Sequence, residues 1–302
     1  MSVDILLAAY NGEKYIESQI LSIVSQTYQN WNLIIHDDGS SDYTVEIVKK
    51  WANIDHRIIL IEDGFIFRNP AQNFLHLLYY SKAELIMFCD QDDIWFDNKV
   101  QKMVDGILMK NNDIPQVLYS NSYVWKEDDG ICGMATLCFP KRIEHFLFLN
   151  AGVQGCVAIF NTKMRELLKS WNGDCAMHDH LLQLFGLTFG EVDYIDIPLM
   201  LYRNHNTNLT GETNVQIVEL NRIIKNRKIP VVDRRHFNTI ERFQQKYSDS
   251  IEISRLYLIN NYIEMVHADF FIRLWKIIKC DFRIYNSTSK LVAKLILRKY
   301  VD

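Results

Sequence analysis

The sequence predicts an α/β protein with a Rossmann-like, mostly parallel sheet flanked by helices, followed by a helical C-terminal extension. Short apolar runs alternate with helical patterns over about the first 110 residues. Short loops join these segments, as they do in the βαβ units that build a parallel sheet. After Asn208-Leu209-Thr210-Gly211 the strand patterns stop and helical patterns replace them.

The predicted strands and helices follow one another in chain order. Val3–Ala9 is apolar after Asp4 and too short for a helix, so we expect a buried strand. Residues Ser40–Asp42 can cap the second helix, and Pro70 stands in the first turn of the third, where proline is tolerated. The other predicted strands are Leu33–His36, Arg57–Ile61, Leu85–Cys89, Val117–Trp125, Val153–Phe160, Tyr194–Ile197 and Leu199–Arg203. The predicted helices are Tyr15–Gln26, Asp42–Asn53, Asn69–Ser81, Asp97–Lys110, His178–Leu187 and Ile251–Lys279.

Composition places the chain among ordinary globular proteins. It has 302 residues, 48% hydrophobic and 23% charged, and too few glycines (12) and prolines (5) for a fibrous or disordered class. The six cysteines form no CxxC pair and no cluster with zinc spacing, so we expect reduced thiols in a cytoplasmic protein. The N-terminal apolar run is short and lacks a basic leader, so no signal peptide is expected. No stretch approaches the ~20 apolar residues of a membrane-spanning helix.

Charge is distributed unevenly behind a net value of −4. Residues 222–302 contain 17 Lys/Arg against 8 Asp/Glu, whereas the preceding 221 residues contain 16 against 29. The pattern at Ile251–Lys279 is amphipathic, aromatic and accompanied by basic residues, which favours an interfacial helix attracted to anionic lipid headgroups. The alternative is a helix packed on the front domain with a solvated face. Nucleic acid is not an expected partner, because the front part is acidic.

Two acidic clusters follow predicted strands, and both should lie on one rim of the sheet, where ligands of such folds bind. Asp90-Gln91-Asp92-Asp93 places three carboxylates in four residues, which repel one another unless a cation compensates. Mg²⁺ and Mn²⁺ prefer carboxylate and phosphate oxygens. Asp37-Asp38-Gly39-Ser40 can accept hydrogen bonds from a base or a ribose. The alternative for both clusters is a turn that caps the next helix.

The known phosphate-binding loops are absent, since the chain has neither GxxxxGK[ST] nor GxGxxG. This argues against a P-loop nucleoside triphosphatase and a dinucleotide enzyme. If a nucleotide diphosphate binds, a divalent metal must neutralise it, and Asp90 and Asp92 are the candidate ligands.

Two later polar stretches also contain candidate residues. Asp179 can serve as a general base, with an Asp cap between solvated histidines at His178 and His180 as the alternative. Arg203 can pair with phosphate, and His205 can be a late metal ligand. The alternative for the second stretch is a solvated loop.

Together these motifs resemble family 2 glycosyltransferases of the GT-A fold, in the form common among rhamnosyltransferase-like members. The resemblance covers residues 1–211, which predicts a GT-A catalytic domain there and a basic, amphipathic helical region at 212–302. Many members have Glu-Asp where this chain has His178-Asp179. The matching segments are Ala9–Ile16, Ser22-Ile23, Gln26–Tyr28, Asp37–Thr44, Asp90–Trp95, Gln154–Cys156, His178-Asp179 and Tyr202–His205 with Asn208 and Gly211.

The resemblance implies a role for each matching position. Asp92 would hold Mn²⁺ or Mg²⁺ on the diphosphate, and Asp179 would be the base of an inverting, single-displacement transfer. The nucleotide side would comprise Ala9, Tyr10 and Glu13 at the pocket wall, Asp38 at the base, and Asp90 at the ribose and sugar. The acceptor side would comprise Trp95, Gln154, Gly155 and His178.

The expected activity is therefore sugar transfer from a nucleotide-sugar donor to a glycan or lipid-linked acceptor in bacterial surface polysaccharide or lipopolysaccharide synthesis. dTDP-rhamnose is the first expected donor, and UDP-galactose, UDP-glucose or a UDP-N-acetylhexosamine is the alternative. The expected location is the cytoplasm, peripheral on the cytoplasmic face of the inner membrane. Two other classes remain open, a non-catalytic nucleotide-sugar-binding module and a nucleotidyltransferase.

Overall fold

The computed structural model describes residues 1–150, 152–205 and 228–301. The chain divides into two compact units. The sheet unit comprises Met1–Thr136, Val153–Asn172 and Gly190–Val215. The helical unit comprises Leu137–Gly152, Gly173–Phe189 and Gln216–Asp302. The domain boundary expected at residues 211 and 212 lies outside the described residues.

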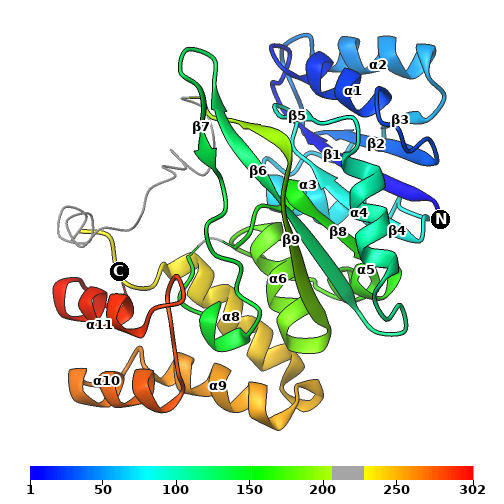
Figure 1. The fold of residues 1–302 in the computed structure, drawn as a ribbon. Coiled ribbons are helices and arrows are strands. Elements are labelled where there is room, and N and C mark those ends of the chain that lie inside the picture. Colours follow the sequence, from blue (N-terminus) through cyan, green and yellow to red (C-terminus); the bar gives the residue numbers. More distant parts are fainter. Residues whose placement is uncertain (151, 206–227, 302) are drawn as a thin grey trace. The chain divides into compact units, whose positions relative to one another are not determined.

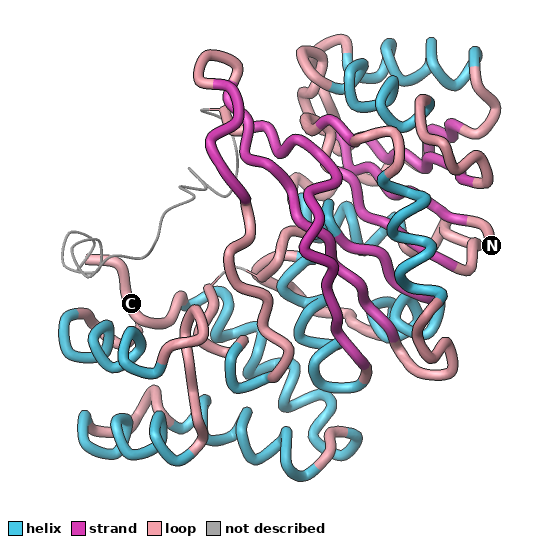
Figure 2. The backbone as a smooth tube through the Cα atoms, in the orientation of Figure 1, coloured by secondary structure: helices cyan, strands magenta, loops and turns pink. Residues whose placement is uncertain are grey.

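Every strand of the described chain lies in one sheet of the sheet unit. Its order is β3-β2-β1-β4-β8-β6-β9-β5, with β7 paired to β6 (Figure 1). β1 pairs in parallel with β2 and β4, β2 with β3, and β6 with β9, which Figure 2 shows side by side. The predicted α/β class is confirmed. The strands are β1 Val3–Ala9, β2 Trp31–Asp37, β3 Ile58–Ile61, β4 Leu85–Cys89, β5 Ile94–Trp95, β6 Gln116–Lys126, β7 Gly130–Met134, β8 Ala158–Asn161 and β9 Glu191–Arg203.

Helices cover this sheet. α3 packs on β1 and β2, α4 packs on β6 and β8, and α5 packs on β8 and β4. α3 begins where the sequence predicts, because the Asn69 side chain accepts hydrogen bonds from the Ala71 and Gln72 N–H groups, at 3.0 and 3.4 Å, and Pro70 follows it. The helices are α1 Ile16–Val24, α2 Thr44–Ile54, α3 Pro70–Leu77, α4 Lys99–Leu108 and α5 Thr162–Lys169, with a 3-10 turn η2 at Gly155–Val157.

Two strand predictions are wrong in detail. The sequence predicts two strands around Pro198, but β9 continues through it. Pro198 stands opposite Asn121 of β6, between two irregularities of the pairing, where the missing N–H of proline interrupts little. The strand predicted at Val153–Phe160 is shorter, because η2 occupies Gly155–Val157 and β8 begins only at Ala158.

The helical unit contains only helices, 3-10 turns and loops among its described residues, apart from two isolated bridges (Figure 2). Aromatic rings fill its core, and the Tyr262 and Phe282 rings lie 5.0 and 5.3 Å from the Phe148 ring. The elements are η1 Ile143–His145, α6 His178–Phe189, α8 Arg234–Tyr247, η3 Ser248–Ser250, α9 Ile253–Glu264, α10 Phe270–Lys279 and α11 Thr288–Leu297.

The single helix predicted at Ile251–Lys279 is wrong, since α9 ends at Glu264 and α10 begins at Phe270. Asp269 caps α10 by accepting a hydrogen bond from the Ile272 N–H at 3.0 Å. The Arg273 guanidinium closes the corner by donating to the carbonyl of Met265 at 2.7 Å. None of the helices described here combines the length and apolar character that crossing a bilayer requires.

Candidate functional site

The candidate site lies at the carboxyl ends of β1, β2 and β4. These strands are parallel, and the register pairs Ala9 with Asp37 and Leu7 with Cys89, so their last residues meet at one edge of the sheet. The loops that follow contain most of the residues predicted to bind a nucleotide sugar, as expected for ligand sites of open α/β sheets.

The loops after β1 and β2 are joined by hydrogen bonds between side chains and backbone. The Asn11 N–H donates to Ser40 Oγ at 2.8 Å, and the Ser41 N–H donates to Asn11 Oδ1 at 2.8 Å. Glu13 takes part in the same connection, since its Oε2 accepts from the Tyr43 N–H at 2.9 Å. The predicted contact of Glu13 with a nucleotide stays a prediction, and in this structure the side chain fixes the second loop.

Gln91 joins the loop after β4 to the loop after β1. Its side-chain amide accepts from the Tyr10 N–H and donates to the Tyr10 carbonyl, both at 2.9 Å. Gly12 makes room for this amide, because a Cβ there would lie 2.3 Å from Gln91 Oε1. The Ala9 carbonyl accepts from the Asp38 N–H at 2.8 Å, while the Tyr10 ring is exposed. Gln91 was not among the predicted site residues, although it stands between Asp90 and Asp92 in the chain.

Asp38 is buried and binds the segment after β3. Its Oδ1 accepts from the Phe67 N–H at 2.5 Å and its Oδ2 accepts from the Asn69 N–H at 3.0 Å. Both carboxylate oxygens therefore have backbone partners. The role expected for Asp38 at a nucleotide base stays a prediction, and its observed contacts hold the 67–69 segment beside the loop after β2.

The structure brings together two residues that the sequence proposes as metal ligands. Asp92 Oδ2 and His205 Nε2 lie 2.8 Å apart, although 113 residues separate them in the chain. Both side chains are mostly buried, and the His205 ring stacks on the Tyr15 ring at 4.9 Å between centroids. A carboxylate oxygen and an imidazole nitrogen suit Mn²⁺, and the carboxylate suits Mg²⁺, so this pair fits a divalent cation.

Arg203 holds this pair in place. Its Nε donates to the Asp92 carbonyl at 2.7 Å, and its backbone N–H donates to Asp93 Oδ1 at 3.0 Å. The guanidinium lies over the Tyr15 ring and is paired with Glu127 at 2.8 Å. The Arg203 side chain is 6% exposed. The predicted pairing of Arg203 with phosphate stays a prediction. Its partner Glu127, on the β6–β7 turn, was not among the predicted site residues.

Asp90, which is half-buried, lies close to the buried residues Asp93 and Cys156. One carboxylate oxygen of Asp90, one of Asp93 and the Cys156 Sγ lie within 4.8 Å of one another. Burial, followed by the charges of Asp92 and Asp90, raises the pKa of Asp93 well above its usual value. Burial lowers the pKa of Lys99 to about 8, and its ammonium donates to the Cys156 carbonyl at 2.6 Å. The predicted contact of Asp90 with ribose and sugar stays a prediction.

The residues predicted on the acceptor side of the sheet unit have packing partners. Trp95 is 3% exposed, its N–H donates to Ser22 Oγ at 3.1 Å, and its ring lies 3.7 Å from the Lys99 ammonium. Gln154 Oε1 accepts from Ser122 Oγ at 3.4 Å. Gly155 is buried in η2. An acceptor role for Trp95, Gln154 and Gly155 stays a prediction.

His178 and Asp179 open α6 in the helical unit. Asp179 is partly exposed, and its Oδ1 accepts from the His180 N–H at 2.6 Å. The alternative of solvated histidines is wrong, because His178 and His180 are both buried. Burial lowers the pKa of His178 to about 3, and burial with the charge of His236 lowers that of His180 well below its usual value. Asn208 and Gly211 lie outside the described residues.

Solved structures with the same architecture define the class. The fragment 1–349 of S. aureus TarS, solved with UDP-GlcNAc, has a TM-score of 0.60 at 13% identity, over 87% of this chain and 70% of that one. The mannosyltransferase PcManGT of Pyrobaculum calidifontis, solved with GDP-Man and Mn²⁺, has a TM-score of 0.52 at 14% identity, over 97% and 86%. The fold is that of the GT-A glycosyltransferases.

The particular family follows from the sequence. A family model described as Glycosyl transferase family 2 matches residues 4–168, and the chain belongs to this family. The dTDP-rhamnosyl transferase RfbG of Shigella flexneri is 28% identical over 217 residues, 68% of this chain and 73% of that protein. The Escherichia coli protein WfgD, named UDP-Glc:alpha-D-GlcNAc-diphosphoundecaprenol beta-1,3-glucosyltransferase, is 33% identical over 163 residues, 52% and 58%. The predicted family and the prediction of a glycosyltransferase are confirmed.

Proposed function

We propose that the protein is a metal-dependent, inverting glycosyltransferase of bacterial surface polysaccharide synthesis, acting on a nucleotide-sugar donor and a glycan or lipid-linked acceptor. The observation that carries this proposal is the Asp92–His205 pair at the carboxyl edge of the sheet, fixed by Arg203. One relative is named a dTDP-rhamnosyl transferase and the other a glucosyltransferase acting on a sugar linked to diphosphoundecaprenol, and both names support this setting for the chain.

dTDP-rhamnose is the donor that we propose first. The relative that aligns with the larger share of this chain is named a dTDP-rhamnosyl transferase. UDP-glucose is the alternative, because the relative with the higher identity is named for UDP-Glc and a diphosphoundecaprenol acceptor. In either case the loops fixed by Asn11, Glu13 and Gln91 would receive the nucleotide without rearranging their own hydrogen bonds.

The proposed cofactor is Mn²⁺ or Mg²⁺, held by Asp92 and His205 with Asp90 beside them. When bound, the ion would neutralise charge that develops on the diphosphate as it leaves. The Mn²⁺ in the mannosyltransferase structure supports a divalent ion in this fold. Arg203 would keep Asp92 and His205 in register through its bonds to the turn after β4.

Asp179 is the proposed general base. Its carboxylate would take the proton from the acceptor hydroxyl while that oxygen forms a bond to the anomeric carbon. The bond from the anomeric carbon to the diphosphate oxygen breaks, and the nucleoside diphosphate leaves with the bonding electron pair. A single displacement of this kind inverts the anomeric configuration. A non-catalytic binding module would have no need of this base.

The test is a donor-hydrolysis screen of the full-length chain. Nucleotide release from dTDP-rhamnose, UDP-glucose, UDP-galactose, UDP-N-acetylglucosamine and GDP-mannose is measured with Mn²⁺, with Mg²⁺ and with EDTA. We expect release from one donor class that requires a divalent ion. Release that EDTA leaves unchanged would contradict the metal-dependent function, and absence of release with every donor and an acceptor extract would favour the binding module.

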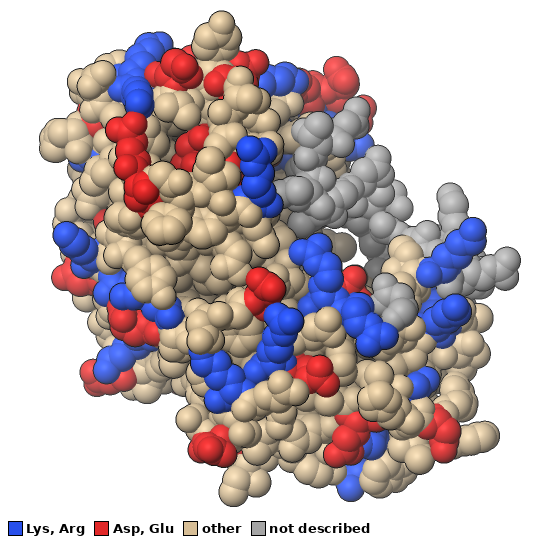
Figure 3. Space-filling view, turned by 180° about the vertical axis from the view of Figure 1, so that it is seen from behind, with Lys and Arg blue, Asp and Glu red and all other residues tan. Residues whose placement is uncertain are grey.

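We further propose that the helical unit binds the membrane surface through α10. Phe271, Trp275 and Ile278 stand at helical spacing and are 78%, 54% and 66% exposed. Lys279 is exposed beside them and lies 4.4 Å from the Trp275 ring. On the face drawn in Figure 3, Lys and Arg side chains are mixed with Asp and Glu, with wide uncharged areas between them. The apolar face of α10, assisted by Lys279, would therefore provide the main contact.

Two basic residues expected at the lipid surface have partners inside the unit. Arg273 donates to backbone carbonyls of Met265 and Val266, and Lys276 is buried and paired with Glu264. The test is co-sedimentation with vesicles. Wild type should bind anionic vesicles in a salt-sensitive way, and the Phe271→Ser, Trp275→Ser variant should not. Equal binding to neutral vesicles, or unchanged binding of the variant, would contradict the proposal.

A further inference from the structure

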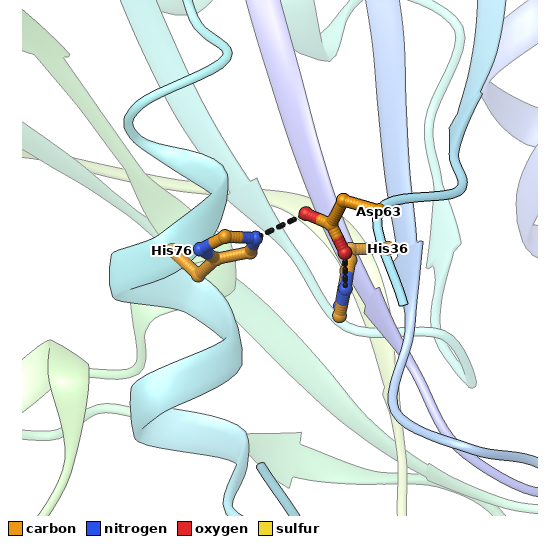
Figure 4. Close-up of side chains that lie close together, drawn as sticks. All are labelled: His36, Asp63 and His76. Carbon is orange, nitrogen blue, oxygen red and sulfur yellow. Dashed lines mark hydrogen bonds and ion pairs between the residues drawn. The ribbon is translucent and has the colours of Figure 1, made fainter. Parts of the chain in front are cut away.

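A second group of potential metal ligands lies outside the residues assigned above. His36 is the penultimate residue of β2, Asp63 follows β3, and His76 lies on α3 (Figure 4). One ligand atom from each lies within 4.8 Å of the others. Asp63 Oδ1 is 3.2 Å from His36 Nε2, and Asp63 Oδ2 is 2.6 Å from His76 Nε2. The two imidazoles thus point at the same carboxylate.

The hydrogen bonds of Asn73 determine how His36 presents its nitrogens. The Asn73 Nδ2 donates to the His36 carbonyl at 3.3 Å, which leaves Asn73 Oδ1 facing His36 Nδ1 at 2.8 Å. An amide oxygen accepts, so Nδ1 carries a proton and donates. Nε2 faces the carboxylate of Asp63, and either a second proton or a cation must lie between these two acceptor atoms. A metal-binding histidine commonly donates its other N–H in this way.

Asp63 also accepts two hydrogen bonds from groups other than the two histidines. The Tyr80 hydroxyl donates to Asp63 Oδ2 at 2.6 Å, and the Phe65 N–H donates to Asp63 Oδ1 at 3.0 Å. The carboxylate of Asp63 is thereby held between the two imidazoles. Its side chain is 16% exposed and that of His76 is 17% exposed, which leaves a path for an ion and for one water ligand.

We propose that His36, Asp63 and His76 form a second metal site that takes a transition-metal ion of the Zn²⁺ class. Two imidazoles and one carboxylate, with an open position for water, are a known ligand set of such ions. The hard cations Mg²⁺ and Ca²⁺ prefer all-oxygen sites and fit it poorly. The Phe65 and Phe67 rings lie 5.3 and 5.0 Å from the His76 ring and shield the site on that side.

The ion would add a direct link between three neighbouring elements of the sheet unit. It would bind β2 through His36, the segment after β3 through Asp63, and α3 through His76. That segment continues to Phe67 and Asn69, whose N–H groups bind Asp38. The site is therefore structural in this proposal, and it does not depend on the function proposed above.

The experiment measures Zn²⁺ binding to the full-length, metal-free protein by competition with a chromophoric chelator. Wild type should bind one Zn²⁺ that Mg²⁺ in excess does not displace. His76→Ala and the isosteric Asp63→Asn should weaken this affinity at least about 100-fold, since loss of a partner beyond the ligands alone costs 10–100-fold. His56→Ala removes an exposed histidine of the same unit and should change nothing. Asp92→Asn should also retain the Zn²⁺ site.

Far-UV circular dichroism of each variant without metal shows that it is folded, and Asp63→Asn preserves the shape of the side chain should His76→Ala fail to fold. Co²⁺ bound in place of Zn²⁺ should give visible bands without sulfur charge-transfer absorption. Absence of Zn²⁺ binding in wild type would overturn the proposal. Binding that is lost in Asp92→Asn but kept in His76→Ala, or a sulfur charge-transfer band, would overturn it equally.

Discussion

Polar side chains have different roles in the sheet unit and in the helical unit. In the sheet unit, Asn11, Asp38 and Gln91 each bind the backbone of another loop. In the helical unit, His178 and His180 are buried, and burial lowers the pKa of both. The first arrangement fixes loops in advance of a ligand, as low-cost binding requires. In the second arrangement, burial favours the neutral form of both histidines at the start of α6.

The largest effect is expected at Asp179, since it is the residue of the helical unit that we propose as the general base. Asp179→Asn should lower transfer about 10²–10⁴-fold, because the variant cannot take up the acceptor proton. Donor affinity should stay the same, since the donor residues belong to the sheet unit. Transfer rates and donor binding are measured together. Asp174→Asn, an exposed neighbour in the same unit, is the control, and retained turnover in Asp179→Asn would remove it from the mechanism.

Gly12 tests the prearranged loops of the sheet unit. Gly12→Ala places a Cβ 2.3 Å from Gln91 Oε1, so it should break the pairing of Gln91 with Tyr10. We expect a loss of about 0.5–1.5 kcal/mol in the free energy of unfolding, because the clash displaces the end of a flexible side chain and breaks exposed hydrogen bonds. Donor affinity should fall with it. In the double variant Gly12→Ala, Gln91→Ala the clash is gone, so the loss of stability should be smaller than the sum of the two single losses, while donor affinity stays low. Additive losses would show that the Gly12→Ala change does not act through the Gln91 amide.

The buried histidines predict a pH dependence of stability. The pKa of His178 falls from 6.5 to about 3 on folding, so below pH 6.5 the unfolded chain binds a proton that the folded chain does not. Stability from this residue is complete above pH 6.5 and falls toward pH 3, by about 1.4 kcal/mol per pH unit. Urea unfolding between pH 7 and pH 5 measures it. His178→Gln should flatten the slope, and His56→Gln, at an exposed site, should not; equal slopes in all three would contradict the burial argument.

The sequence predicts the sheet unit better than the helical unit, for a local reason. Val3–Ala9 and Leu85–Cys89 are short apolar runs between turn residues, and both are strands with those bounds. The continuity of β9 could not be predicted, because a proline such as Pro198 usually ends a strand. It is tolerated here because the pairing with β6 is irregular at the same point, which only the structure shows. The break before α10 had a local signal in Asp269, which the continuous apolar pattern of Ile251–Lys279 concealed.

The candidate site shows the same division between local and distant information. Asp92 and His205 were both proposed from their own motifs, and the structure places them together. The residues that hold Asp92 and His205 in place could not be predicted from motifs. Glu127 reaches Arg203 only because β6 and β7 form a hairpin, and the group of His36, Asp63 and His76 assembles from two strand ends and a helix. Such contacts depend on the fold and have no spacing signature along the chain.

The most direct measurement is Mn²⁺ binding, followed by electron paramagnetic resonance, in the presence of UDP or dTDP. Wild type, Asp92→Asn, His205→Gln and the double variant are compared. If Asp92 and His205 hold one ion, each single variant should bind Mn²⁺ at least about 10-fold more weakly, and the double variant should lose less than the sum of the two. Mn²⁺ affinity of both single variants equal to that of wild type would contradict the account.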